Sequence, residues 1–164
     1  MAKTPSKEPV ALPLFDRLLQ GDNIETDINV DRAIRVLRES IRRDLETLFN
    51  TRPRYLALPE GLNELQSSLV AFGLPDLQIQ QMASATQQEV FRRRLEAVVR
   101  RFEPRLRELS VEIVKGDEQA RDRTLRFRIN AVLDVASTSE IVIYDTVVDP
   151  VSGALSFAGG TTTV

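Results

Sequence analysis

The chain has 164 residues, of which 42% are hydrophobic and 28% are charged, and its net charge at neutral pH is −2. This length and composition fit one globular domain, and the near-neutral charge gives no overall attraction to nucleic acid or to anionic membranes. Histidine and cysteine are both absent, which excludes Ser-His-Asp and Cys-His catalysis, disulfides, and imidazole or thiolate metal ligands.

The N-terminal segment does not have the pattern of a secretory signal, because it lacks an apolar core and a small-residue cleavage site. No run approaches the roughly 18 apolar residues of a transmembrane helix, and MAKTPSKEPVALP has no apolar signal core. We therefore expect a cytoplasmic protein without membrane insertion. Three prolines among polar residues predict that residues 1–13 form a flexible arm.

Helical spacing of the apolar residues predicts the elements of the first two thirds of the chain. In LFDRLLQG, the helical spacing of Leu14, Phe15, Leu18 and Leu19 predicts a short amphipathic helix that ends at a glycine. This helix docks either on the sheet of its own chain or in the groove of a partner. Two long helices are predicted over residues 34–50 and 87–102, and a shorter one over residues 62–72, with a turn at FGLPD.

From Leu109 onward the period of the apolar residues changes from about 3.6 to 2, which indicates strands. Residues 109–113 and 125–135 alternate as strands with one solvent-exposed face do, whereas EIVIYDTVV is apolar on both faces and predicts a central or covered strand. DPVSG is a turn that joins this strand to ALSF.

Helices before strands predict an α+β fold, in which N-terminal helices pack on a mainly antiparallel C-terminal sheet. We expect a single domain over residues 14–158, with a flexible tail over residues 159–164.

The segment FRRRLEAVVRRFEPRLRE contains seven arginines, and one interpretation is a nucleic-acid-binding helix. The alternative is a solvated or partner-facing helix. Arg92, Glu96 and Arg100 have the spacing of i,i+4 ion pairs, and no aromatic residues alternate with the arginines to stack on bases. These features favour the second interpretation.

The tripeptide Glu103-Pro104-Arg105 interrupts this basic segment. Pro104 should end the helix, which leaves the Glu103 carboxylate near a helix C-terminus, where a negative charge is unfavourable unless a cation or N–H donors compensate it. Arg101, Arg105 and Arg107 are the local candidates. The resulting corner either forms an ion pair within the chain or presents both charges to another subunit.

A glycoside hydrolase needs only two carboxyl groups, and Glu103, Asp134 and Asp145 are the candidates for such a pair. The sequence does not fix their separation, and it contains no tryptophan to bind a sugar ring. Asp145 lies in an otherwise apolar strand, either as a polar group with a partner or as part of a contact site. No metal or cofactor is predicted.

Six motifs follow one another along the chain: LFDRL, ESIRRDLETLFNTR, FGLPDL, VVRRFEPRL, LRFRINAVL and IVIYDTVVDPVSG. This ordered set resembles the TssE family of type VI secretion systems and the gp25-like wedge proteins of contractile phage baseplates, over about residues 14–157. The Glu-Pro-Arg motif of the family maps onto Glu103, Pro104 and Arg105. The resemblance implies that these residues help to hold the helical core bundle of the wedge together.

The resemblance also implies a non-catalytic structural subunit in a membrane-docked baseplate, which helps to initiate the sheath by offering an edge of its sheet to sheath strands. The implied partners are the wedge subunits TssF, TssG and TssK and the sheath proteins TssB and TssC, without nucleic acid or cofactor. The alternatives are a muramidase-like glycoside hydrolase and a nucleic-acid-binding adaptor. The residues expected to contact other subunits are Glu103, Pro104, Arg105, Leu14, Phe15 and Leu18.

Overall fold

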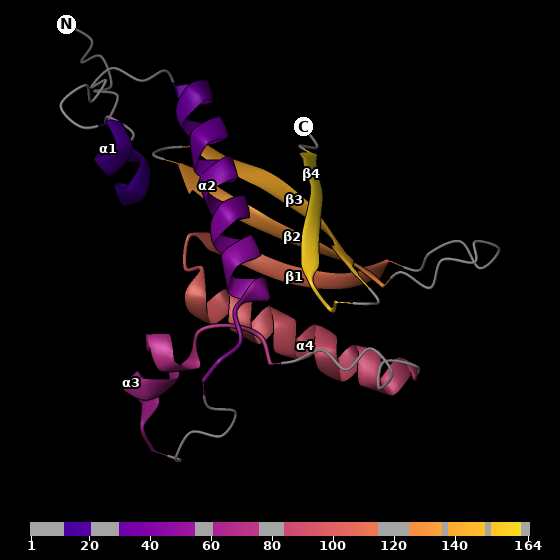
Figure 1. The fold of residues 1–164 in the computed structure, drawn as a ribbon. Helices are drawn as coiled ribbons and strands as arrows, with labels where there is room; N and C mark the ends of the chain where they lie inside the picture. Colours follow the sequence, from indigo (N-terminus) through magenta and orange to yellow (C-terminus); the bar gives the residue numbers. More distant parts are fainter. Residues whose placement is uncertain are drawn as a thin grey trace, which may run out of the picture.

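The computed structural model describes residues 12–20, 30–54, 61–75, 84–114, 125–135, 138–149 and 152–161. In this part of the chain, helices precede a four-stranded antiparallel sheet, so the predicted α+β fold is confirmed (Figure 1). The elements are α1 (Leu14–Gln20), α2 (Val30–Asn50), α3 (Asn63–Gln66), the 3-10 helix η1 (Leu69–Ala71), α4 (Ala85–Phe102), β1 (Leu106–Val114), β2 (Arg126–Val135), β3 (Thr138–Val148) and β4 (Leu155–Thr161).

The strands form a meander in the order β1-β2-β3-β4, so that β1 and β4 are the two edges. Successive residues of β2 alternate between buried positions, which are all apolar, and less buried positions, which are mostly polar, as the sequence pattern predicts. The strand EIVIYDTVV is β3, which lies between β2 and β4 as the predicted central strand. Its outer face is only partly covered, and Ile141 there is 54% exposed.

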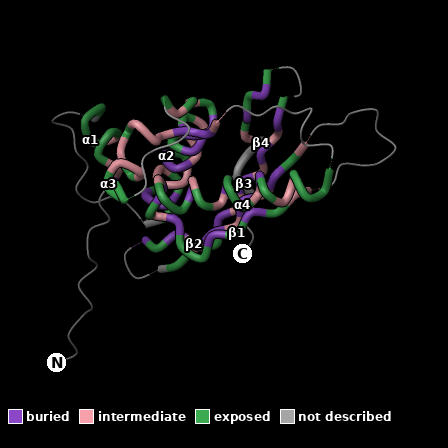
Figure 2. The backbone as a smooth tube through the Cα atoms, turned by 90° about the horizontal axis from the view of Figure 1, so that it is seen from below, coloured by how far each residue is buried: buried purple, intermediate pink, exposed green. Residues whose placement is uncertain are grey.

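Helices α2 and α4 cover the inner face of the sheet (Figure 1). The buried side of α2 includes Ile41 and Leu45, and that of α4 includes Leu95 and Val99, all of which are fully buried. Figure 2 shows the buried residues gathered between these two helices and the strands, whereas α1 is exposed along most of its length. Burial of each large apolar side chain contributes about 1.5–3 kcal/mol, so this layer is the main source of stability.

The region 62–72, for which we predicted one helix, forms the single turn α3 and the 3-10 turn η1 instead. The two serines between these turns account for the break. The hydroxyls of Ser67 and Ser68 donate to the carbonyls of Glu64 and Leu65, and Ser68 Oγ also accepts the N–H of Val70. Such local side-chain bonds compete with a continuous helix.

The ends of the domain differ slightly from the predicted boundaries. Strand β4 runs to Thr161, so residues 159–161, which we placed in the tail, belong to the sheet. Leu12, which we placed in the arm, is buried. Residues 1–11 and 162–164 lie outside the described residues, so the predicted flexibility of both ends stays a prediction.

No helix in the described part of the chain is long and apolar enough to cross a bilayer.

Candidate functional site

The predicted corner lies where α4 passes into β1, and only three residues separate the helix from the strand. Pro104 disfavours helical geometry for the residue before it, and Glu103 has φ −125° and ψ 75°, outside the helical region. The N–H of Glu103 still donates to the carbonyl of Val99 at 2.8 Å, which closes the last helical turn. The chain therefore leaves the helix at a fixed point and direction.

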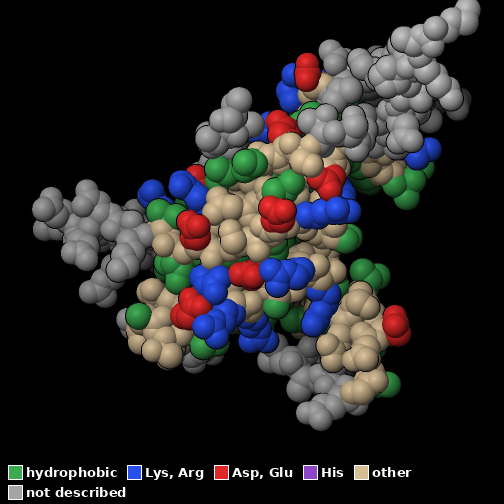
Figure 3. Space-filling view, turned by 180° about the vertical axis from the view of Figure 1, so that it is seen from behind, with side chains coloured by type: hydrophobic (Ala, Val, Ile, Leu, Met, Phe, Trp, Pro, Cys, Tyr) green, Lys and Arg blue, Asp and Glu red, His purple; other side chains and the backbone are tan. Residues whose placement is uncertain are grey.

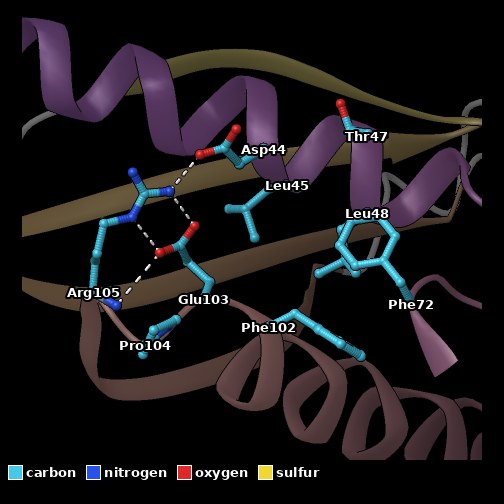
Figure 4. A pocket seen from close by; sticks show the side chains of 9 residues that line it. All are labelled: Asp44, Leu45, Thr47, Leu48, Phe72, Phe102, Glu103, Pro104 and Arg105. Carbon is cyan, nitrogen blue, oxygen red and sulfur yellow. Dashed lines mark hydrogen bonds and ion pairs between the residues drawn. The ribbon is translucent and has the colours of Figure 1, made fainter. Parts of the chain in front are cut away.

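The carboxylate of Glu103 turns inward, and the residue is only 3% exposed. Both of its oxygens contact the guanidinium of Arg105, through Nε and Nη2, as the dashed lines of Figure 4 show. The N–H of Arg105 adds a weaker bond to Oε1 at 3.4 Å. Arg105 is therefore the cation that compensates the carboxylate at the helix C-terminus, and the two-pronged contact is the strong form of such a pair.

The other two candidate cations have different partners. Arg101 contacts Gln66, and Arg107 pairs with Asp134 at 3.1 Å on the outer face of the sheet. The sequence thus predicts that Glu103 needs a cation, and the structure shows that this cation is Arg105.

Asp44 of α2 is the third member of the corner, and no local sequence pattern indicates it. Its Oδ2 lies 2.5 Å from Nη2 of Arg105, so one guanidinium connects α2 with the end of α4 and the start of β1. Hydrogen bonds from Arg105 to Glu103 and then to Asp44 raise the pKa of Arg105, and they outweigh the opposite effect of its burial. The corner therefore holds one fixed positive and two negative charges.

A groove opens beside this corner, with a cavity volume of about 350 Å³. Its floor is apolar and its rim is charged or polar (Figure 4). The rings of Phe72 and Phe102 meet edge to face, with their centroids 5.2 Å apart, and form one wall. The lining residues are Asp44, Leu45, Thr47, Leu48, Phe72, Phe102, Glu103, Pro104 and Arg105.

The geometry gives no support to a catalytic carboxylate pair. Asp145 pairs with Arg128 directly across the β2–β3 ladder, whereas Asp134 lies six residues further along β2 (134 − 128). Six residues of a strand span about 20 Å, well beyond the roughly 5–9.5 Å between the two acids of a glycoside hydrolase. Glu103 is occupied by Arg105 on the buried side of the corner. Asp145 is thus a polar group with a partner in the same sheet.

The second predicted site, α1, attaches to the rest of the molecule through its polar side. Asp16 accepts a hydrogen bond from Arg43 of α2 at 2.8 Å. The apolar side faces away: Leu14, Phe15 and Leu18 are 69%, 62% and 70% exposed. Because Arg43 and Asp44 are consecutive, α1 and the corner attach to the same turn of α2, about 100° apart around its axis.

The arginines of α4 and the corner are mostly paired within the chain. Five of the seven have acidic partners, whereas Arg94 and Arg101 are exposed and Arg101 contacts Gln66. The predicted i,i+4 pairs of Glu96 with Arg92 and Arg100 are both present, at 2.8 Å. On the face seen in Figure 3, basic and acidic side chains are interspersed, in contrast to the continuous basic stripe of a nucleic-acid-binding surface.

A small α+β domain with a charged corner beside an apolar groove, and with an exposed apolar helix, has the surfaces of a protein that contacts other proteins. The sequence profile of the family described as baseplate wedge protein gp25 matches residues 35–138, which include most of α2, the whole of α4, the corner and strands β1 and β2. The chain belongs to this family of baseplate wedge proteins. It is therefore a structural baseplate subunit, as the resemblance implied. No curated protein matches the chain.

Proposed function

We propose that this chain is a TssE-type subunit of a type VI secretion baseplate, which joins the wedge subunits and helps to start sheath assembly. The observation that carries the proposal is the Glu103–Arg105–Asp44 cluster at the rim of an apolar groove. Family membership supports the baseplate role, and the Glu-Pro-Arg motif within its ordered set of neighbours supports the TssE subtype.

The corner contacts helices of the wedge, with TssF, TssG and TssK as partners. A helix from such a partner inserts an apolar side chain between Leu48 and Phe72, while its polar residues meet the charged rim. The side chains of Arg105 and Asp44 are 31% and 55% exposed, so they are accessible to a partner without movement of the backbone. Because Pro104 and the two-pronged ion pair already fix the corner, little conformational entropy is lost on binding.

The sheet contributes the second part of the function, because it recruits the sheath proteins TssB and TssC. An edge strand has N–H and C=O groups along its outer side, and a strand from a sheath subunit pairs with them by strand addition. The protein acts from the cytoplasm, in a baseplate that other subunits attach to the membrane. It performs no catalysis in this role.

The experiment that tests the proposal is affinity purification of the tagged chain from its own cell, in wild-type and variant forms. Alanine at Arg105 leaves the buried Glu103 carboxylate without its cation, which costs about 3–5 kcal/mol and affects folding as well as binding. Alanine at Glu103 leaves Arg105 paired with Asp44 alone. Arg105→Lys is therefore the informative change, because it keeps the charge but loses the planar two-nitrogen contact. Arg107→Lys, two residues further along and 72% exposed, is the matched control.

We expect wild-type chain and the Arg107→Lys variant to co-purify the wedge subunits and to support sheath formation. The Arg105→Lys variant should lose both while its thermal unfolding midpoint stays close to that of the wild type. Full wedge recovery with Arg105→Lys and with Glu103→Ala would exclude the corner as the contact. Recovery of no baseplate protein by the wild-type chain would reject the proposed function as a whole.

A further inference from the structure

The two edges of the sheet are not equally accessible to a partner strand. We propose that strand addition takes place at the β4 edge, from Phe157 to Thr161, and that α4 closes the β1 edge to it. The partner is an extended segment of a sheath subunit that pairs through its main chain. This inference rests on the proposed function, since it presupposes that a strand joins this sheet.

The β1 edge is covered by two arginines of α4. Arg100 Nη2 donates to the carbonyl of Leu109 at 3.2 Å, and Arg92 Nη1 donates to the carbonyl of Val111 at 3.0 Å. Residues two apart in a strand present their main-chain groups on the same side, so these carbonyls are successive acceptors of the outer edge. In Figure 1, α4 runs beneath β1 along this edge.

These arginines are held firmly in place. Glu96 lies between them on α4 and pairs with both at 2.8 Å, and Arg92 also pairs with Glu89. A strand that docked on β1 would have to displace both guanidiniums and would leave their carboxylate partners without cations. The main-chain hydrogen bonds of an added strand each contribute only a small net free energy, so this loss would offset them.

The β4 edge has a side-chain partner at its first residue, Leu155. The Asn50 side chain accepts the N–H of Leu155 at 3.1 Å and donates to its carbonyl at 2.9 Å, as a neighbouring strand would. The outer edge of β4 is therefore defined by the groups of Leu155 and, two residues on, of Phe157. Strand β4 continues for six residues beyond Leu155, and no strand of the described part of the chain pairs outside it.

The sequence of β4 beyond Phe157 also suits the approach of another main chain. Gly159 and Gly160 follow Phe157, and glycines in a strand are typical of a bulge or of a place where a second backbone comes close. The β3–β4 register shifts between Phe157 and Gly160, which is the bulge. The corresponding irregularity of β1, at Glu108 with φ +48°, lies under the arginines of α4 instead.

Site-specific photo-cross-linking separates the two edges, because the chain offers a matched pair of positions. Ser156 on β4 and Ser110 on β1 are both exposed and both lie on the outer face of an edge strand. A benzophenone amino acid at each position is cross-linked in cells that assemble sheaths, and the products are identified by mass spectrometry. We expect a cross-link to a sheath subunit at Ser156 and none at Ser110.

Each other outcome has a distinct meaning. A sheath cross-link at Ser110 alone would overturn the choice of edge but leave strand addition intact. Absence of a sheath cross-link at both positions, in cells with normal sheaths and recovered wedge subunits, would overturn the strand-addition part of the proposed function as well. A cross-link from Ser156 to another segment of this chain would show that the β4 edge is occupied from within, which also overturns the inference.

A second measurement tests the closure of β1. The double change Arg92→Ala and Arg100→Ala should expose the β1 carbonyls, so the purified variant should self-associate in light scattering while retaining its sheet content by circular dichroism. Arg93→Ala with Arg94→Ala, on the same helix but without a bond to β1 among the described residues, is the control and should stay at the wild-type size. If both double variants had the same size in light scattering, Arg92 and Arg100 would not be what prevents pairing at the β1 edge.

Discussion

At Gly73 the backbone geometry accepts glycine and leaves no room for a side chain. Its φ is +119°, and a Cβ atom placed there would lie 2.2 Å from the carbonyl oxygen of Thr51. The next residue, Leu74, is fully buried and donates its N–H to that same oxygen at 2.9 Å. Gly73 and Leu74 of the FGLPDL motif thus pack against Thr51 of the NTR motif. This contact holds the neighbouring Phe72 in the wall of the groove.

Replacement of Gly73 by alanine should therefore lower the free energy of unfolding considerably. The strained backbone alone costs about 1–3 kcal/mol, and the overlap with Thr51 adds to it because the obstacle is main chain. Gly61→Ala is the control, since Gly61 also has a positive φ, +89°, but has open space around it. Urea unfolding of both variants measures the difference, and equal losses would show that the contact with Thr51 has little energetic importance.

The corner shows how far a residue-level prediction from sequence reaches. The proline after the helix predicted an uncompensated carboxylate at Glu103, and Arg105 was among its predicted partners because it is close in sequence. Asp44 could not be predicted, since it is 61 residues away from Arg105 and lies beside it only after α2 has packed on the sheet. The charges of Glu103 and Arg105 could be paired from the local sequence, whereas the pairing of Asp44 with Arg105 depends on tertiary structure.

At the scale of the element, α1 is held by its polar side and exposes its apolar side. We predict that the double change Phe15→Ala and Leu18→Ala weakens recovery of the wedge subunits but changes the free energy of unfolding by no more than about 0.5 kcal/mol, as is usual for exposed positions. Leu69→Ala, at an 88% exposed apolar residue of η1, serves as the control for general surface effects. Unchanged recovery with the double variant would show that α1 is not a docking element.

Helix α4 carries a carboxylate whose titration can be followed directly. Hydrogen bonds from Arg92 and then Arg93 lower the pKa of Glu89 from its ordinary 4.5 to about 2. Because the pKa is lower in the folded state, the resulting stabilisation is fully present above about pH 4.5 and is lost as the pH falls toward 2.

Carbon-detected NMR titration of the Glu89 carboxyl should confirm this low midpoint. In the Arg93→Gln variant, which removes one of the two donors, the midpoint should move upward while the helix stays folded. A midpoint near 4.5 in the wild-type protein would mean that solvent screens these pairs in solution.

The strands were predictable where their pattern is regular and not where it is interrupted. The alternation of β2 and the central position of β3 follow from apolar period alone. The first residues of β1 were missed because a bulge at Glu108 places Leu106 and Leu109, three residues apart, on the same buried face. A period-2 search cannot detect such a strand start, since the extra residue reverses the phase.

For the whole molecule, the order of helices and strands was sufficient to predict the class of fold, and the motifs were sufficient to indicate the family. Packing of helices on the sheet was predicted, but the meander order of the strands, the choice of α2 and α4 as the covering helices, and the groove at the corner were not, because each depends on which distant segments pack together. The same holds for the unequal edges, since the arginines that cover β1 read in the sequence as ordinary i,i+4 partners of Glu96.

The hydrogen bonds between Asn50 and Leu155 have a consequence for the folding of the chain during its synthesis on the ribosome. They join residues separated by 105 positions, and the partner of Asn50 belongs to the last strand. Because chains are synthesised from the N-terminus, α2 emerges early but cannot form its bonds to β4 until nearly the whole domain has been translated. The end of α2 therefore lacks its contacts with β4 during most of synthesis, and the described sheet is complete only when β4 has joined it.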